Sequence, residues 1–93
     1  MPIDPTKETS RNLKALMEIR RAIDSVKEGY VDPLEAIAVV TLSVFGGVIR
    51  KEASPDVIKN VCVPMDAWLV SALYGDSFEA AKILREMDNH IPK

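Results

Sequence analysis

The chain of 93 residues is 47% hydrophobic and 28% charged, and its 12 basic and 14 acidic side chains leave a net charge of −2. These proportions indicate a folded globular protein and exclude the disordered, collagen-like and low-complexity classes, while the length suits one domain spanning residues 1–93. With one cysteine and one histidine, the sequence offers neither an internal disulfide nor a zinc-finger spacing, and its near-neutral charge gives no general attraction to nucleic acid.

A first helix is predicted over residues 5–28. Asp4 precedes a proline, which suits the first helical position because its missing N–H is not needed there. Leu16, Ile19 and Ile23 fall on one arc of this helix, as in an amphipathic surface helix. Gly29 stands where a residue in the left-handed conformation commonly ends a helix.

A second helix is predicted from Pro33 to Ile49. Asp32 and Glu35 form a capping box, in which the Asp32 carboxylate accepts from the Glu35 N–H. After Glu35, the only polar side chains up to Ile49 are Thr41 and Ser43. A helix that is apolar all round must be covered all round, so this helix is expected at the centre of the fold.

A β-hairpin is the alternative for part of this segment. Residues 38–45 are rich in β-branched side chains, and Gly46-Gly47 is a hairpin turn signal. The second arm is short, however, and the apolar residues do not alternate. We therefore prefer the helix, in which the two glycines allow another backbone to approach closely.

Three shorter helices complete the predicted fold. One begins at Pro55 after a Ser54 cap and ends near Val61, because Pro64 disfavours helical geometry in the residue before it. The next runs from Pro64 or Met65 to Tyr74.

The last helix runs from Ser77, after an Asp76 cap, to about Asn89, and Gly75 separates it from the helix before. No segment alternates well enough to require a sheet. The predicted class is therefore all-α: a compact single-domain bundle of about five helices around the apolar second helix.

The chain shows no sign of a membrane segment or a signal peptide. Its N-terminus lacks a basic-then-apolar profile. The longest uncharged run, residues 36–49, falls short of the roughly 20 residues that a spanning helix needs. We expect a cytoplasmic protein without membrane contact, where a single free thiol at Cys62 is ordinary.

The sequence gives little support to catalysis. The single side chain suited to act as a base near neutral pH, His90, lies close to the chain end, where positioned catalytic groups are uncommon. Cys62 lies in an apolar stretch that raises a thiol pKa, as expected of buried filler. We expect no enzymatic activity, no cofactor and no metal.

Four side chains are candidates for contact with a partner protein. Arg20 interrupts the apolar arc of the first helix, either as a snorkelling side chain paired with Asp24 or, with Arg21, as an anchor in an interface. Trp68 and Tyr74 lie on a helix with few polar residues, where they either fill the core or form an exposed aromatic patch.

One short string has a counterpart in a known family. Residues 19–24 resemble the opening of the helical chorismate mutases, but here Gly29 and Asp32-Pro33 end the helix early, and the later basic and polar site residues of that family find no match. The sequence is therefore assigned to no family.

The function that these observations favour is a small non-catalytic helical protein that acts by protein–protein binding, as an inhibitory or regulatory module. The alternative is a structural or accessory subunit of a larger assembly. A DNA-binding regulator ranks behind both, because a helix-turn-helix over residues 36–61 would present only Lys59 and Asn60 to DNA. The apolar second and fourth helices are either covered completely within one chain, as a monomer, or partly covered by a second copy, in a two-fold homodimer with Trp68 and Tyr74 as anchors.

Overall fold

The computed structural model describes residues 3–36, 40 and 48–92, and every regular element in these residues is helical. The predicted all-α class with about five helices is confirmed. The elements in chain order are the 3₁₀ turn η1 (Pro5–Lys7), α1 (Ser10–Lys27), α3 (Val48–Glu52), α4 (Pro55–Val57), the π-helical turn η2 (Ile58–Cys62), α5 (Val63–Leu73) and α6 (Ser77–Asp88).

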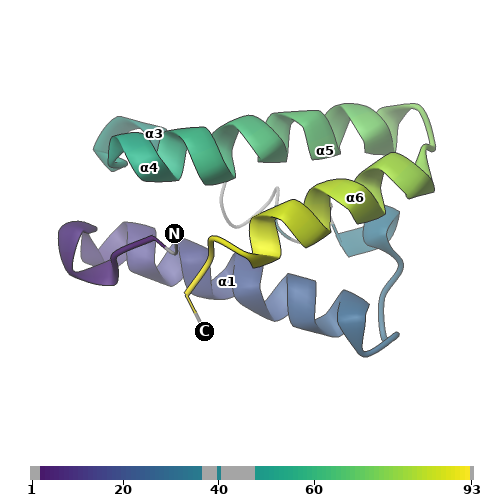
Figure 1. Cartoon of the computed structure of the whole chain (residues 1–93), viewed down its shortest axis with the longest axis horizontal. Coiled ribbons are helices and arrows are strands. Elements are labelled where there is room, and N and C mark those ends of the chain that lie inside the picture. Colours follow the sequence, from purple (N-terminus) through teal and green to yellow (C-terminus); the bar gives the residue numbers. More distant parts are fainter. Residues whose placement is uncertain (1–2, 37–39, 41–47, 93) are drawn as a thin grey trace.

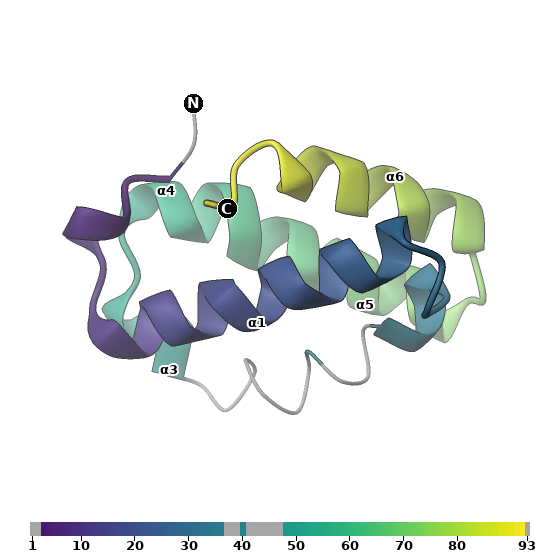
Figure 2. The same cartoon turned by 90° about the horizontal axis from the view of Figure 1, so that it is seen from below.

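The helices form a compact body of 33 × 24 × 20 Å. In Figure 1, α4 and α5 run along one edge, α1 runs in the same direction along the opposite edge, and α6 returns in the reverse direction. Figure 2 shows α6 beside α1, with α5 behind. The two ends of the chain meet, because the Ile3 N–H donates to the His90 carbonyl at 2.8 Å.

The core lies between α1, the α4–α5 rod and α6. Trp68 of α5 is its largest fully buried side chain, and the indole Nε1 donates to the Pro33 carbonyl at 2.8 Å. This bond fastens the segment after α1 against α5. The other buried apolar side chains are Ile3, Leu16, Ile19, Ile23, Ala36, Val40, Val57, Val61, Cys62, Met65, Ala80, Ile83, Leu84, Met87 and Ile91.

The first predicted helix is two elements in the structure. Asp4 caps η1 by accepting from the Thr6 N–H at 2.9 Å, but the chain then extends at Glu8 and restarts as α1. Thr9 causes the restart, because the hydroxyl Oγ1 accepts from the Asn12 N–H at 3.2 Å. The predicted continuous helix over 5–28 was therefore wrong in its first turn.

The predicted end of this helix is confirmed. Gly29 has a φ of 82°, and its N–H donates to the Val26 carbonyl at 3.1 Å. The Tyr30 N–H reaches back to the Ser25 carbonyl at 2.9 Å. These two bonds make a Schellman motif, which satisfies carbonyls that the helix end would leave free.

The second predicted helix begins as expected, since residues 33–36 are helical. The Asp32 carboxylate accepts from the Leu34 N–H at 2.8 Å, one residue before the Glu35 N–H that was predicted. Most of the predicted helix, the hairpin alternative and the Gly46-Gly47 pair lie outside the described residues.

Pro64 does not break the chain, contrary to the sequence prediction. The helical path continues from α4 through η2 into α5. In an α-helix the Pro64 ring would clash with the carbonyl four residues earlier. The π turn removes this conflict by adding a residue: the Val63 N–H donates to the Ile58 carbonyl, five residues back. The two helices that were predicted separately, one from Pro55 to near Val61 and one from Pro64 or Met65 to Tyr74, are therefore one continuous rod.

The turn between α5 and α6 follows its predicted chemistry. The Asp76 carboxylate accepts from the Glu79 N–H at 3.0 Å and caps α6. Gly75 has a φ of 68°, and the Asp76 N–H reaches back to the Ser71 carbonyl at 2.8 Å. This second Schellman motif reverses the chain so that α6 packs along α5.

Gly75→Ala is expected to lower the free energy of unfolding by about 1 kcal/mol, because a Cβ is strained at positive φ. A Cβ built at Gly75 meets no atom within 4 Å, so backbone strain is the whole effect. Urea denaturation measures the loss. Gly75→Asn should lose less, since Asn tolerates this conformation. An Ala variant as stable as the wild type would contradict the left-handed turn.

Candidate functional site

Arg20 joins α1 to the C-terminal end of the chain. Arg20 is only 9% exposed, and its guanidinium binds the Asp24 and Asp88 carboxylates. Nη2 also donates to the Asp88 carbonyl at 3.0 Å and to the Ile91 carbonyl at 2.8 Å. The planar fork of donors suits Arg to this task, because one side chain satisfies two carboxylates and two carbonyls.

The predicted pairing of Arg20 with Asp24 is confirmed, at 3.2 Å. The contacts with the C-terminal segment come from residues far away in the sequence. Lys27 adds a second cation to Asp88 at 3.1 Å. The hydrogen bond from Arg20 and the hydrogen bond from Lys27 hold the pKa of the Asp88 carboxyl below its ordinary value. Asp88 thus stays ionised where it is half-buried.

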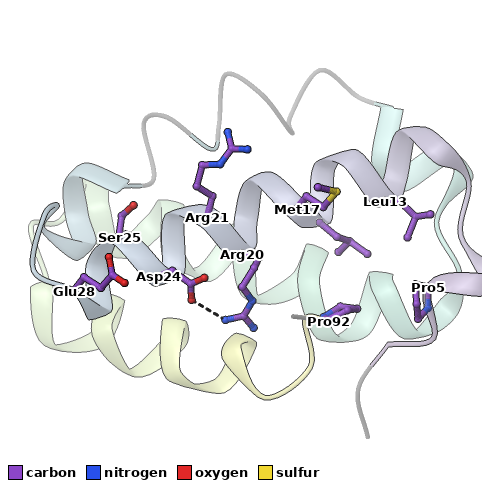
Figure 3. A pocket seen from close by; sticks show the side chains of 10 residues that line it. Pro5, Leu13, Met17, Arg20, Arg21, Asp24, Ser25, Glu28 and Pro92 are labelled. Atoms are coloured by element: carbon purple, nitrogen blue, oxygen red, sulfur yellow. Dashed lines mark hydrogen bonds and ion pairs between the residues drawn. The ribbon is translucent and has the colours of Figure 1, made fainter.

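A groove of about 660 Å³ runs along α1 beside this cluster, and Figure 3 shows it from close by. Arg20 reaches across the groove toward the end of α6, while Pro5 and Pro92 lie on the side opposite α1. The lining residues are Pro5, Leu13, Leu16, Met17, Arg20, Arg21, Asp24, Ser25, Glu28 and Pro92. The groove therefore contains both arginines that the sequence singled out.

Apolar and charged side chains occupy different parts of the groove. Leu13 and the 63%-exposed Met17 stand at one end, and the exposed Asp24 and Glu28 stand at the other. Arg21 lies between them, its guanidinium 3.4 Å from the Glu18 carboxylate. The groove thus offers an apolar surface followed by a charged one, in which Asp24 is already paired with Arg20.

The structure does not bring Trp68 and Tyr74 to this groove, and it separates them from each other. Trp68 is fully buried in the core, where it cannot meet a partner without unfolding. Tyr74 is 84% exposed at the end of α5. Of the two interpretations of these aromatics, core packing is correct for Trp68 and surface exposure is correct for Tyr74.

A second surface, which we call the α5 surface, includes Tyr74. It consists of the exposed large apolar side chains of α5 and the start of α6: Val63, Val70, Leu73, Tyr74 and Phe78. Sequence reasoning named only Tyr74 among them. The sequence held one sign of this surface, the nearly unbroken apolar composition of the helix. That composition indicates that most faces of the helix are buried by other elements, but it does not show which face the fold leaves exposed.

The described residues place few reactive groups together. Burial raises the pKa of the Cys62 thiol, as its apolar sequence context predicted. Within residues 3–36, 40 and 48–92, no three His, Cys, Asp or Glu side chains are grouped closely enough to hold a metal ion. In the same ranges, no helix has the length and apolar character needed to cross a bilayer.

Arg20→Met should lower the free energy of unfolding by about 3 kcal/mol, because it leaves a half-buried carboxylate and two carbonyls without their donor. Arg21→Met is the matched control on the same helix. The Arg21 side chain is 71% exposed, so its loss should change stability by less than about 0.5 kcal/mol. Urea denaturation compares the two variants, and equal losses would contradict the stabilising role of the Arg20 contacts with Asp88 and Ile91.

The Asp88 carboxylate should make stability fall in acid. Since its folded pKa is lowered, its contribution is present above the unfolded value of about 3.9 and disappears as the pH falls below it. The free energy of unfolding should therefore drop more steeply below about pH 5 in the wild type than in Asp88→Asn. Parallel pH profiles for the two proteins would contradict this assignment.

Comparison of the chain with family models, with curated proteins and with solved structures finds no match. The function therefore has to be argued from the groove, the α5 surface and the chemistry of their side chains. Neither surface was evident as a unit in the sequence. The groove combines side chains of α1 with Pro5 and Pro92 from the two ends of the chain, and the α5 surface combines exposed side chains of α5 with Phe78 of α6.

Proposed function

We propose that this protein is a non-catalytic binding module that regulates or inhibits another protein, and that the groove along α1 receives a segment of that partner. The groove carries the proposal. Its volume of about 660 Å³ lies within the range of roughly 300–1,000 Å³ typical of binding sites. Its lining is mainly apolar, with a few charged groups that can fix the orientation of a bound segment.

The lining defines the chemistry of the partner segment. Apolar side chains suit the end formed by Leu13 and Met17, and the unbranched, flexible Met17 can adapt to their shape. A basic side chain suits the other end, beside the exposed Glu28, because Asp24 is already paired with Arg20. A partner segment with apolar residues followed by a lysine or arginine is therefore the expected ligand.

Other kinds of function receive less support from this groove. Its most buried ionisable group, Arg20, already serves the Asp24 and Asp88 carboxylates, so it is committed to holding the fold rather than to chemistry. The lining carries two arginines and two acidic residues, so the groove offers no net positive charge to the phosphates of nucleic acid. The free thiol of Cys62 is consistent with a reducing, cytoplasmic setting for the proposed activity.

Met17→Glu should reduce the capture of a partner by immobilised protein at least tenfold, which corresponds to about 1.4 kcal/mol of binding free energy. The new carboxylate would lie in the apolar end of the groove and would have to be desolvated by the partner. Capture from an extract of the source cells, quantified by mass spectrometry, measures the change.

Tyr30→Glu is the matched control, since it also places a carboxylate at an exposed apolar position. Tyr30 is 79% exposed and lies outside the groove lining. Partners that bind the groove should be retained by this variant. If Met17→Glu retains the same proteins in the same amounts as the wild type, the groove is not the binding site.

A further inference from the structure

From the α5 surface we infer that the protein forms a two-fold homodimer in which α5 packs antiparallel against α5 of a second copy. The exposed fractions of its five large apolar side chains range from 50% for Val70 to 84% for Tyr74. The helix α5, which carries most of this surface, runs along the edge of the molecule opposite α1 (Figure 1), and none of the five side chains lines the groove. The inference is therefore independent of the groove and of the function proposed for it.

The spacing of the exposed residues is that of a helix–helix seam. Val63, Ala67, Val70 and Tyr74 are all exposed and follow one another at intervals of four, three and four residues. Residues with this spacing recur about every 3.7 residues, close to the 3.6 residues of one helical turn, so they lie on one stripe of the helix that can contact a second packed helix. Leu73 widens the stripe on one side.

The order of side chains along the stripe favours the antiparallel arrangement. The intervals four, three and four are the same in both directions, so a reversed copy stays in register. Val63 then packs against the partner's Tyr74, and Ala67 packs against the partner's Val70. Each pair combines a smaller side chain with a larger one, and the small Ala67 near the centre lets the two backbones approach. A parallel pair would instead oppose Ala67 to Ala67 and Tyr74 to Tyr74.

The charges at the two ends of the stripe are complementary in the same arrangement. Lys59 is exposed about one turn before Val63, and the acidic Asp76 and Glu79 follow Tyr74. An antiparallel copy brings Lys59 toward the partner's acidic end, whereas a parallel copy would place like charges together. Within α5 the one charged side chain, Asp66, is already paired with Arg50.

Cysteine crosslinking tests the register. In the Val63→Cys/Tyr74→Cys double variant, mild oxidation should give a covalent dimer, because each new thiol faces the other one across the interface. Each single variant should run as a monomer in denaturing electrophoresis. In the antiparallel dimer, the introduced cysteine of one copy lies about 16 Å along the helices from the same cysteine of the second copy, too far for a disulfide. The same separation prevents a disulfide within one chain, and the wild type controls for the buried Cys62. Crosslinking of the single variants would overturn the antiparallel register.

Light scattering at micromolar concentration tests the dimer itself. The wild type should show twice the chain mass of 10.3 kDa. Val70→Glu should show the mass of one chain with an unchanged helical far-UV dichroism spectrum, while Tyr30→Glu should remain a dimer. A wild-type mass of one chain, without crosslinking of the double variant, would overturn the inference. It would not affect the groove, whose test uses Met17.

Discussion

The arrangement of the N-terminal and C-terminal segments depends on the hydrogen bonds of the Arg20 guanidinium. This guanidinium rises from the middle of α1 and binds the Asp88 carboxylate together with the carbonyls of Asp88 and Ile91. Ile91 is itself buried, and Ile3 reaches the same region through its hydrogen bond to His90. One cation buried at low dielectric thus organises the end of α6, the C-terminal segment and, through that segment, the N-terminal segment.

The proposed binding groove shares this dependence. Pro92, which lines the groove opposite α1, follows the Ile91 carbonyl that Arg20 holds. Pro5 lies two residues after Ile3, whose N–H is bonded to the His90 carbonyl. The shape of the groove is therefore set by the same bonds that stabilise the fold. The buried Arg20 positions the walls of the groove, whereas one of the two interpretations of the sequence made Arg20 itself an anchor in an interface.

Local chemistry made much of the fold predictable. Helix ends at Gly29, Ser54, Gly75 and Asp76 follow from capping and from left-handed glycine, because these effects involve residues only a few positions apart. Pro64 was misjudged for a different reason. A proline excludes the α-helical hydrogen-bond pattern, but a π turn one residue earlier restores a continuous path, and nothing in the local sequence distinguishes this outcome from a break.

The candidate sites were less predictable because they depend on contacts between distant residues. Arg20 was recognisable as an exception on an apolar arc, yet its partners Asp88 and Ile91 lie 68 and 71 residues away. Trp68 and Tyr74 looked alike in the sequence, since both belong to a helix that is apolar nearly all round. Tertiary packing decides between them: Trp68 is fully buried and bonded to the Pro33 carbonyl, whereas Tyr74 is 84% exposed.

The two proposals are compatible because they use different edges of the molecule. A dimer formed through α5 would cover the α5 surface and leave the α1 groove of each copy accessible, since α1 and α5 lie on opposite edges (Figure 1). Two grooves in one dimer can bind two segments of a single partner or of a partner that is itself dimeric. The second contact would then form at a high effective concentration, so a weak interaction in each groove suffices for tight overall binding. On these two proposals, the protein would gain affinity from its symmetry rather than from a larger interface.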